Sequence, residues 1–87
     1  EGKLPLVALF EKEDEDYTKH IKIAKILLEK GAWIDQQEPS TGQTALHAAA
    51  LYTDQLEVIE FLMSYNPNVN LQDKKLETPL HEAAQGK

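Results

Sequence analysis

The sequence predicts an all-α fold, a solenoid of antiparallel helix pairs joined by hairpin loops. Three observations lead to this prediction. The segment Thr44-Ala45-Leu46-His47 recurs 34 residues later as Thr78-Pro79-Leu80-His81. The segment Ile26-Leu27-Leu28 recurs 35 residues later as Phe61-Leu62-Met63. Apolar residues also follow a helical spacing over 56–63. A period near 34 residues is typical of helical repeats, which bury their apolar faces against one another.

The first repeat, about 4–37, predicts two helices near 4–10 and 18–30. Leu4-Pro5-Leu6-Val7 stands where the later repeats have the Thr-x-Leu-His motif, so this repeat is degenerate. An acidic insertion, 11–20, lengthens the connection between the two helices. Gly31 is expected to end the second helix, because glycine adopts the left-handed conformation that terminates helices.

The second repeat, about 42–72, predicts helices at roughly 44–53 and 56–65. Thr44 can cap the first helix with its hydroxyl, and a polar break near 53–55 separates the two helices. Asn66-Pro67 is expected to end the second helix, since Asn tolerates the left-handed conformation and Pro cannot continue a helix.

The third repeat, about 76–87, is partial and predicts a single helix. Thr78 can cap it, and Pro79 then occupies the first helical position, where its missing N–H costs nothing. We therefore expect about two and a half repeats in one domain, 1–87, with the last helix face uncovered. Because about three repeats are usually needed for stability, we expect the chain to be a fragment of a longer protein.

Composition and charge narrow the possible partners. The chain has no cysteine, which excludes disulfides and thiolate metal sites, and no apolar run long enough to insert into a membrane. No segment resembles a signal peptide, so we expect an intracellular protein, cytoplasmic or nuclear. The net charge is −6, with five acids and one base in 11–16. This charge would repel phosphate backbones, so nucleic acid is not an expected partner.

Taken together, the motifs resemble the ankyrin repeat. Segments 44–50 and 78–84 are similar to the family's T-P-L-H-x-A-A pattern, and 31–35 and 66–70 are similar to its G-A-x-V-N pattern. The resemblance covers almost the whole chain. It implies a scaffold that binds other proteins through hairpin tips and the inner face of the first helices of each pair.

Carried onto this sequence, the resemblance gives a predicted partner-binding set at the tips 37–43 and 73–77 and on the first helices. The set is Trp33, Gln37, Glu38, Gln43, Ala48, Leu51, Tyr52, Asn68, Lys74, Lys75, Leu76 and Glu82. Trp33 holds the variable position of G-A-x-V-N, for which we favour an exposed side chain over one buried beneath the first repeat. Leu76 stands where the family has glycine, so we expect a strained, exposed leucine at the tip.

Other residues invite catalytic or metal-binding interpretations. His47 and His81 could be metal ligands or bases, but the resemblance favours bonds from each ring back to its capping threonine. The run 11–16 could bind calcium, but it lacks the glycine of a calcium loop. We therefore expect residues 11–17 to be a solvated, mobile loop that could attract a basic partner. We also expect His20 to be solvated. No catalytic residue, metal site or cofactor is predicted.

Three functional hypotheses follow. The favoured one is a protein-interaction scaffold with an unidentified protein partner. The alternative is a regulatory or anchoring segment that acts in cis on a larger enzyme or channel. A small enzyme is the least favoured, because the sequence has no Ser-His-Asp, H-E-x-x-H or phosphate-loop pattern.

Overall fold

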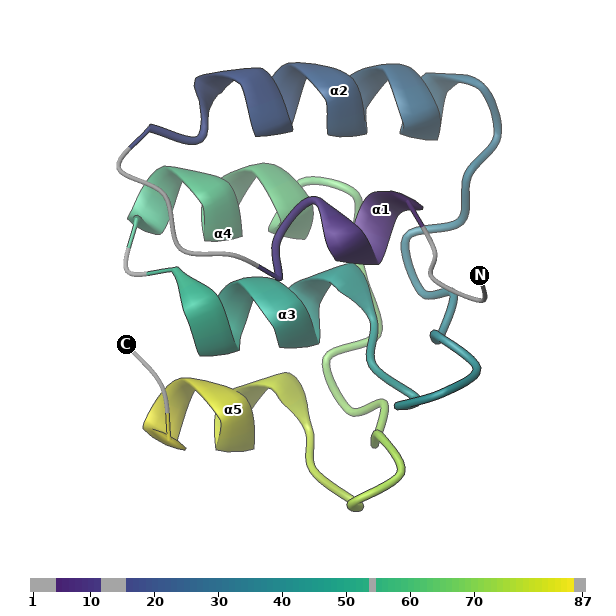
Figure 1. The fold of residues 1–87 in the computed structure, drawn as a ribbon, viewed down its shortest axis with the longest axis vertical. Coiled ribbons are helices and arrows are strands. Elements are labelled where there is room, and N and C mark those ends of the chain that lie inside the picture. The colour runs from purple at the N-terminus through teal and green to yellow at the C-terminus, as the bar shows by residue number, and fades with distance from the viewer. Residues whose placement is uncertain (1–4, 12–15, 54, 86–87) are drawn as a thin grey trace.

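The computed structural model of the chain describes residues 5–11, 16–53 and 55–85. Within these ranges all regular structure is helical, which confirms the predicted all-α class. The helices are α1 (Pro5–Ala8), α2 (Thr18–Glu29), α3 (Ala45–Tyr52), α4 (Leu56–Met63) and α5 (Pro79–Gln85). Figure 1 shows α2 at one end of the stack and α5 at the other.

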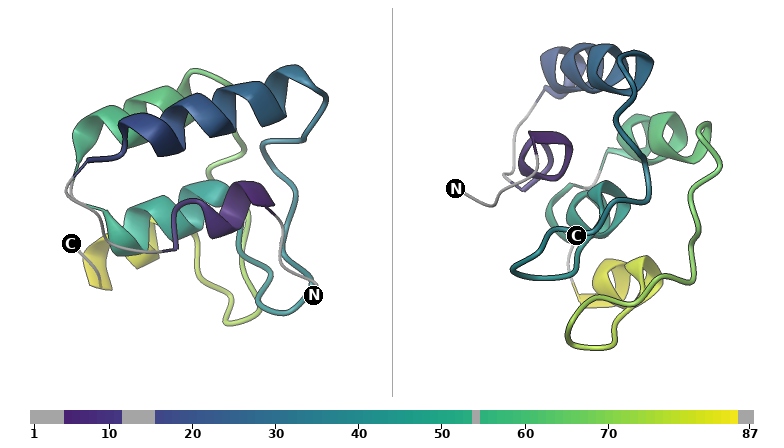
Figure 2. Two further views of the ribbon diagram at one scale, coloured as in Figure 1. Left: turned by 45° about the horizontal axis from the view of Figure 1, so that its top comes forward. Right: turned by 90° about the vertical axis from the view of Figure 1, so that its right-hand side faces the viewer.

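The helices form two layers, which are seen end-on in Figure 2. The layer of α1, α3 and α5 runs in one direction, and the layer of α2 and α4 runs in the opposite direction. α1 and α3 are therefore each followed by an antiparallel second helix, as the repeat pattern predicted. The long connections to α3 and α5 leave the same side of the stack and lie side by side.

Helix α3 is the centre of the core because it contacts α1, α4 and α5. Ala45, Ala48 and Ala49 are fully buried, and Leu46 is nearly so. Alanine side chains are short, so they allow neighbouring helices to approach closely, and α4 closes this core with Val58 and Leu62.

The predicted helix ends are confirmed where backbone geometry decides them. Gly31 has a φ of 105° directly after α2, and Asn66 has a φ of 56° after α4. Both residues adopt the left-handed conformation that ends a helix.

The capping role of His47 is also confirmed. The Thr44 hydroxyl accepts a bond from the His47 backbone N–H, while His47 Nδ1 lies 3.1 Å from the Thr44 backbone nitrogen as an acceptor. Since Nδ1 accepts, Nε2 carries the proton and donates to the Glu77 carbonyl at 2.9 Å. The buried ring therefore joins its own helix cap to the next hairpin.

His81 repeats half of this arrangement. Its Nδ1 accepts from the Thr78 backbone nitrogen at 3.1 Å and lies 3.1 Å from the Thr78 hydroxyl. The ring is exposed, unlike that of His47.

The first repeat departs from the expectation of a wholly exposed connection. Tyr17 is 1% exposed and its ring stacks on Phe10 at a centroid distance of 6.4 Å. The prediction that residues 11–17 are all exposed is therefore wrong at Tyr17, because burying two aromatic rings outweighs leaving the connection in water. His20 is half-buried with its ring 5.0 Å from that of Tyr17, rather than solvated. Residues 12–15 lie outside the described residues.

Candidate functional site

The two hairpin loops, 36–43 and 71–77, are held against each other by hydrogen bonds. The Lys74 N–H donates to the Thr41 carbonyl at 2.9 Å. The Gln37 side-chain amide donates to the carbonyls of Gly42 and Gln72, at 2.9 Å and 2.8 Å. Backbone and side-chain bonds that cross between loops fix their relative position, so the tips form one surface rather than two separate loops.

The contact depends on the glycine of the first hairpin. Gly42 has a φ of 75°, and a Cβ atom built there would lie 2.8 Å from the Lys74 nitrogen and 3.2 Å from the carbonyl carbon of Asp73. No side chain fits in that space. Leu76 occupies the equivalent position of the second hairpin, with a φ of 65°, but its side chain is 69% exposed. The predicted strained and exposed conformation of Leu76 is confirmed.

The predicted partner-binding residues divide by exposure. Trp33 is 64% exposed, which agrees with the favoured interpretation of its position. Five other members are exposed and three are half-buried. The exposed ones are Gln37, Asn68, Lys74, Lys75 and Leu76, and the half-buried ones are Gln43, Leu51 and Tyr52.

The remaining three members, Glu38, Ala48 and Glu82, are buried within the chain. Ala48 lies in the helix layer between α1 and α5. Glu38 Oε1 accepts bonds from the hydroxyls of Ser40 and Thr41, at 3.0 Å and 3.1 Å, within its own loop. The solvent-facing part of the predicted set is therefore the hairpin tips, Trp33 and the end of α3.

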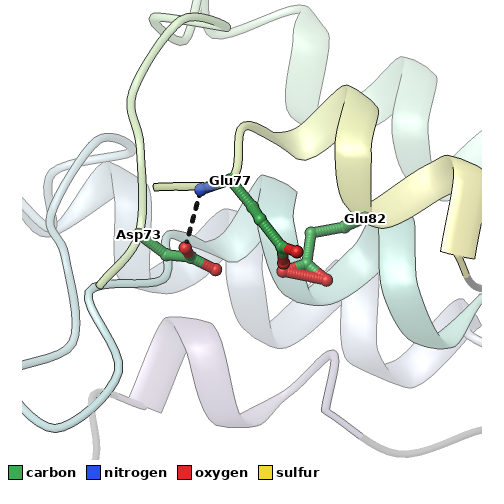
Figure 3. Close-up of side chains that lie close together, drawn as sticks. All are labelled: Asp73, Glu77 and Glu82. Atoms are coloured by element: carbon green, nitrogen blue, oxygen red, sulfur yellow. Dashed lines mark hydrogen bonds between the residues drawn. The ribbon is translucent and has the colours of Figure 1, made fainter. Parts of the chain in front are cut away.

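A cluster of three carboxyl groups, which the sequence analysis did not identify, lies where the second hairpin meets α5 (Figure 3). Asp73, Glu77 and Glu82 place carboxylate oxygens within 4.8 Å of one another. Asp73 Oδ1 accepts from the backbone N–H groups of Lys75 and Glu77, at 2.9 Å and 3.0 Å. Glu82 Oε1 accepts from the Gln43 amide at 3.3 Å.

Burial sets the protonation of this cluster. Burial first, then a hydrogen bond with Asp73 and repulsion by Glu77, raises the pKa of Glu82 to about 7. Burial also acts to raise the pKa of Asp73. Hydrogen bonds from the Glu77 N–H, the Glu82 carboxyl and the Lys75 N–H outweigh it and hold that pKa below the usual value. The proton therefore belongs to Glu82, which can share it with the charged Asp73.

The sequence contained one signal for this cluster. Glu82 is equivalent to Ala48 in the preceding repeat, and a charged residue at a position that elsewhere takes alanine indicates a special environment. Among the described residues, these three carboxyl groups are the set that could share a metal ion. Their bonds to backbone N–H groups, to Gln43 and to each other account for their proximity without one.

An apolar groove of about 560 Å³ runs between α3, α4 and α5. Four large side chains that are exposed in the chain line it, namely Leu56, Met63, Val69 and Leu80. Leu80 is 79% exposed, whereas its equivalent in the preceding repeat, Leu46, is 4% exposed. Within the described residues, no helix covers this side of α5 as α5 covers α3.

Comparison with known proteins gives a consistent result. The family model for ankyrin repeats in three copies matches residues 15–87. An ankyrin repeat protein of Fowlpox virus (strain NVSL), FPV024, is 42% identical over 60 residues, which is 69% of this chain. An ankyrin repeat protein of Rickettsia felis is 41% identical over 59 residues, which is 60% of this chain.

The matched segments are small parts of these relatives. They span 10% of the viral protein and 25% of the bacterial one. None of the helices in the described ranges is long and apolar enough to cross a membrane.

Proposed function

The chain belongs to the ankyrin-repeat family, and on that premise we propose that it binds a partner protein through its hairpin tips and the neighbouring end of α3. Ankyrin repeats are generally protein–protein interaction modules and generally not enzymes. The proposed contact residues are the solvent-facing members of the predicted set. These are Trp33, Gln37, Gln43, Leu51, Tyr52, Asn68, Lys74, Lys75 and Leu76.

The observation that carries this proposal is the conformation of Leu76. Its N–H donates to the Asp73 carbonyl at 2.9 Å, and the neighbouring hairpin holds Lys74 through the bond to Thr41. The leucine is thus presented to solvent by a backbone whose shape is fixed. Because this backbone is already ordered, a partner that covers the leucine does not have to order the loop as well, which suits the residue to a binding role. The fold itself does not require a leucine at this exposed position.

A pull-down with the purified, tagged chain tests the proposal. We expect Leu76→Gly and Trp33→Ala to reduce partner capture. The matched control is Leu80→Ala, since Leu80 is also an exposed leucine but lies in the groove. Loss of capture in Leu80→Ala alone would assign the partner to the groove and contradict a binding role for the tips.

The alternative function is regulation or anchoring in cis, in which these repeats contact another part of the same protein. The matched relatives are several times longer than the matched segment, which is compatible with such an arrangement. Measuring the activity of the full-length parent with and without Leu76→Gly would distinguish a cis role from binding of a separate protein. A cis role predicts that the substitution changes this activity even when no partner is added. We also propose an intracellular location, cytoplasmic or nuclear.

A further inference from the structure

Three large exposed apolar side chains belong neither to the groove nor to the hairpin tip. Ile23 is 47% exposed and Ile26 is 54% exposed, and both lie on α2. Trp33 is 64% exposed and follows shortly after the end of that helix. Ile23 and Ile26 lie on α2, at the end of the stack opposite α5 (Figure 1), and the proposed hairpin contact, which includes Trp33, does not account for them.

The two isoleucines lie on one side of α2 together with lysines. Lys19, Ile23, Ile26 and Lys30 are separated by four, three and four residues, a spacing that places them along one side of a helix, with Lys22 beside them. All five are exposed. The opposite side contains Ala24, which is fully buried against the core. We call Lys19, Lys22, Ile23, Ile26 and Lys30 the α2 stripe.

The charge of the α2 stripe is opposite to that of the molecule. Residues 18–30 contain four of the nine lysines and one glutamate, in a chain whose net charge is −6. Within the part of the chain that the structure describes, no ion pair neutralises Lys19, Lys22 or Lys30. A surface that joins uncompensated lysines to half-exposed isoleucines is suited to a partner that is acidic and apolar at once.

We propose that the α2 stripe is a second docking surface, which binds an acidic amphipathic helix of another protein. The spacing of four and three residues is the one at which two helices interlock along a seam, so Ile23 and Ile26 would pack between apolar residues of the partner. Lys19, Lys22 and Lys30 border this seam and would pair with acidic residues at its edges.

Other classes of ligand fit the α2 stripe less well. Nucleic acid binding rests on many contacts between basic side chains and phosphates, and the α2 stripe offers three lysines in a chain whose net charge is −6. Two half-exposed isoleucines offer little apolar area for insertion into a bilayer surface. A helix partner needs only a narrow apolar seam, which is what the stripe provides.

The test uses the full chain and a synthetic fluorescein-labelled helical peptide with leucines at heptad spacing flanked by glutamates. A scrambled peptide of the same composition is the control ligand. Binding is measured by fluorescence anisotropy, with the emission of Trp33, the single tryptophan, as a second signal. We expect the Lys22→Glu/Lys30→Glu variant and the Ile23→Ser/Ile26→Ser variant each to raise the peptide Kd about tenfold. Far-UV circular dichroism should be unchanged, because the altered side chains are exposed.

The matched control is Lys74→Glu/Lys75→Glu, which makes the same charge change at the hairpin tip. It should leave the peptide Kd within about twofold of the unaltered chain. An equal loss in both lysine variants, or equal binding of the scrambled peptide, would reduce the effect to overall charge and overturn the proposal. Tighter binding to phosphatidylserine vesicles than to the peptide, or dimerisation that Ile23→Ser/Ile26→Ser abolishes, would also overturn it. The substitutions in the α2 stripe change no residue of the proposed hairpin contact, so the two proposals can fail independently.

Discussion

Gly42 and Leu76 have nearly the same backbone conformation but opposite surroundings. Their φ angles are 75° and 65° at positions 34 residues apart in the repeat. Sequence alignment of the repeats predicted this equivalence and the strain at Leu76. It did not reveal that Gly42 lies at contact distance from Lys74 whereas Leu76 faces water, because the distance between hairpins is set by their packing.

This difference predicts opposite effects for two small substitutions. Gly42→Ala should lower the free energy of unfolding by about 2 kcal/mol, since it adds left-handed strain and a Cβ atom against the second hairpin. Leu76→Gly should leave the free energy of unfolding unchanged or raise it by up to about 1 kcal/mol, because it removes the strain at an exposed site. Urea denaturation of both variants measures this. Destabilisation by Leu76→Gly would mean that the leucine supports the fold.

The protonation of Glu82 predicts a pH dependence of stability. Its pKa in the folded chain is about 7, above the usual 4.5 expected when the chain is unfolded. The folded state therefore binds the proton more tightly, so this contribution to stability is complete below about pH 4.5 and is lost as the pH rises through 7. Asp73 acts in the opposite sense. Its lowered pKa stabilises the folded chain at neutral pH, and this contribution is lost only when the pH falls below the usual pKa range of an aspartate.

We expect the thermal midpoint of the unaltered chain to fall between about pH 5 and pH 8, and that of Glu82→Gln to fall less, because glutamine stays neutral. The difference between the two chains isolates the contribution of Glu82, because all other groups are common to both. Parallel curves would mean that Glu82 is ionised throughout this range and that the carboxyl groups do not share a proton.

At the scale of the helices, the predictability of each element depended on whether its ends carry local signals. The predicted ends of α3 and α4 carry a threonine, a polar break or a left-handed terminator, and the structure places these helices within about two residues of the predicted bounds. α5 begins at Pro79, the predicted first helical position. The first repeat lacks the Thr-x-Leu-His motif. Its connection between α1 and α2 is held by the packing of Phe10 on Tyr17. That contact joins Phe10, just before the insertion, to Tyr17 within it, so no local pattern could predict it.

The two threonines that precede α3 and α5 should differ in their contributions to stability. Thr44 is 3% exposed and forms the reciprocal arrangement with His47, whereas Thr78 is half-buried beside an exposed His81. We expect Thr44→Ala to cost about 2 kcal/mol and Thr78→Ala about 1 kcal/mol or less, since water can replace an exposed cap. Chemical denaturation of the two variants tests the order, and a larger loss for Thr78→Ala would contradict it.

At the scale of the whole molecule, exposed apolar residues mark three separate surfaces. One is the groove on α3, α4 and α5, the second is the proposed hairpin contact with Leu76 and Trp33, and the third is α2 with Ile23 and Ile26. The sequence predicted the first from the missing second helix of the third repeat and the second from the leucine at a glycine position. The lysines and isoleucines of α2 were visible in the sequence, but which side of the helix faces the core required its packing against the rest of the stack.

The groove gives a prediction that compares two leucines of the same motif. Leu46→Ala should lower the free energy of unfolding by about 3 kcal/mol, because it leaves a cavity in a packed core. Leu80→Ala should change it by no more than about 0.5 kcal/mol, because Leu80 is already 79% exposed. Fusing a helix with the apolar pattern of α4 after Lys87 should bury Leu80. In that extended chain, Leu46→Ala and Leu80→Ala should lower the free energy of unfolding by similar amounts. Leu80→Ala could instead destabilise the chain without the fused helix as much as Leu46→Ala does. That result would mean that another part of the chain closes the groove in solution, so that its apolar face is not available to a partner.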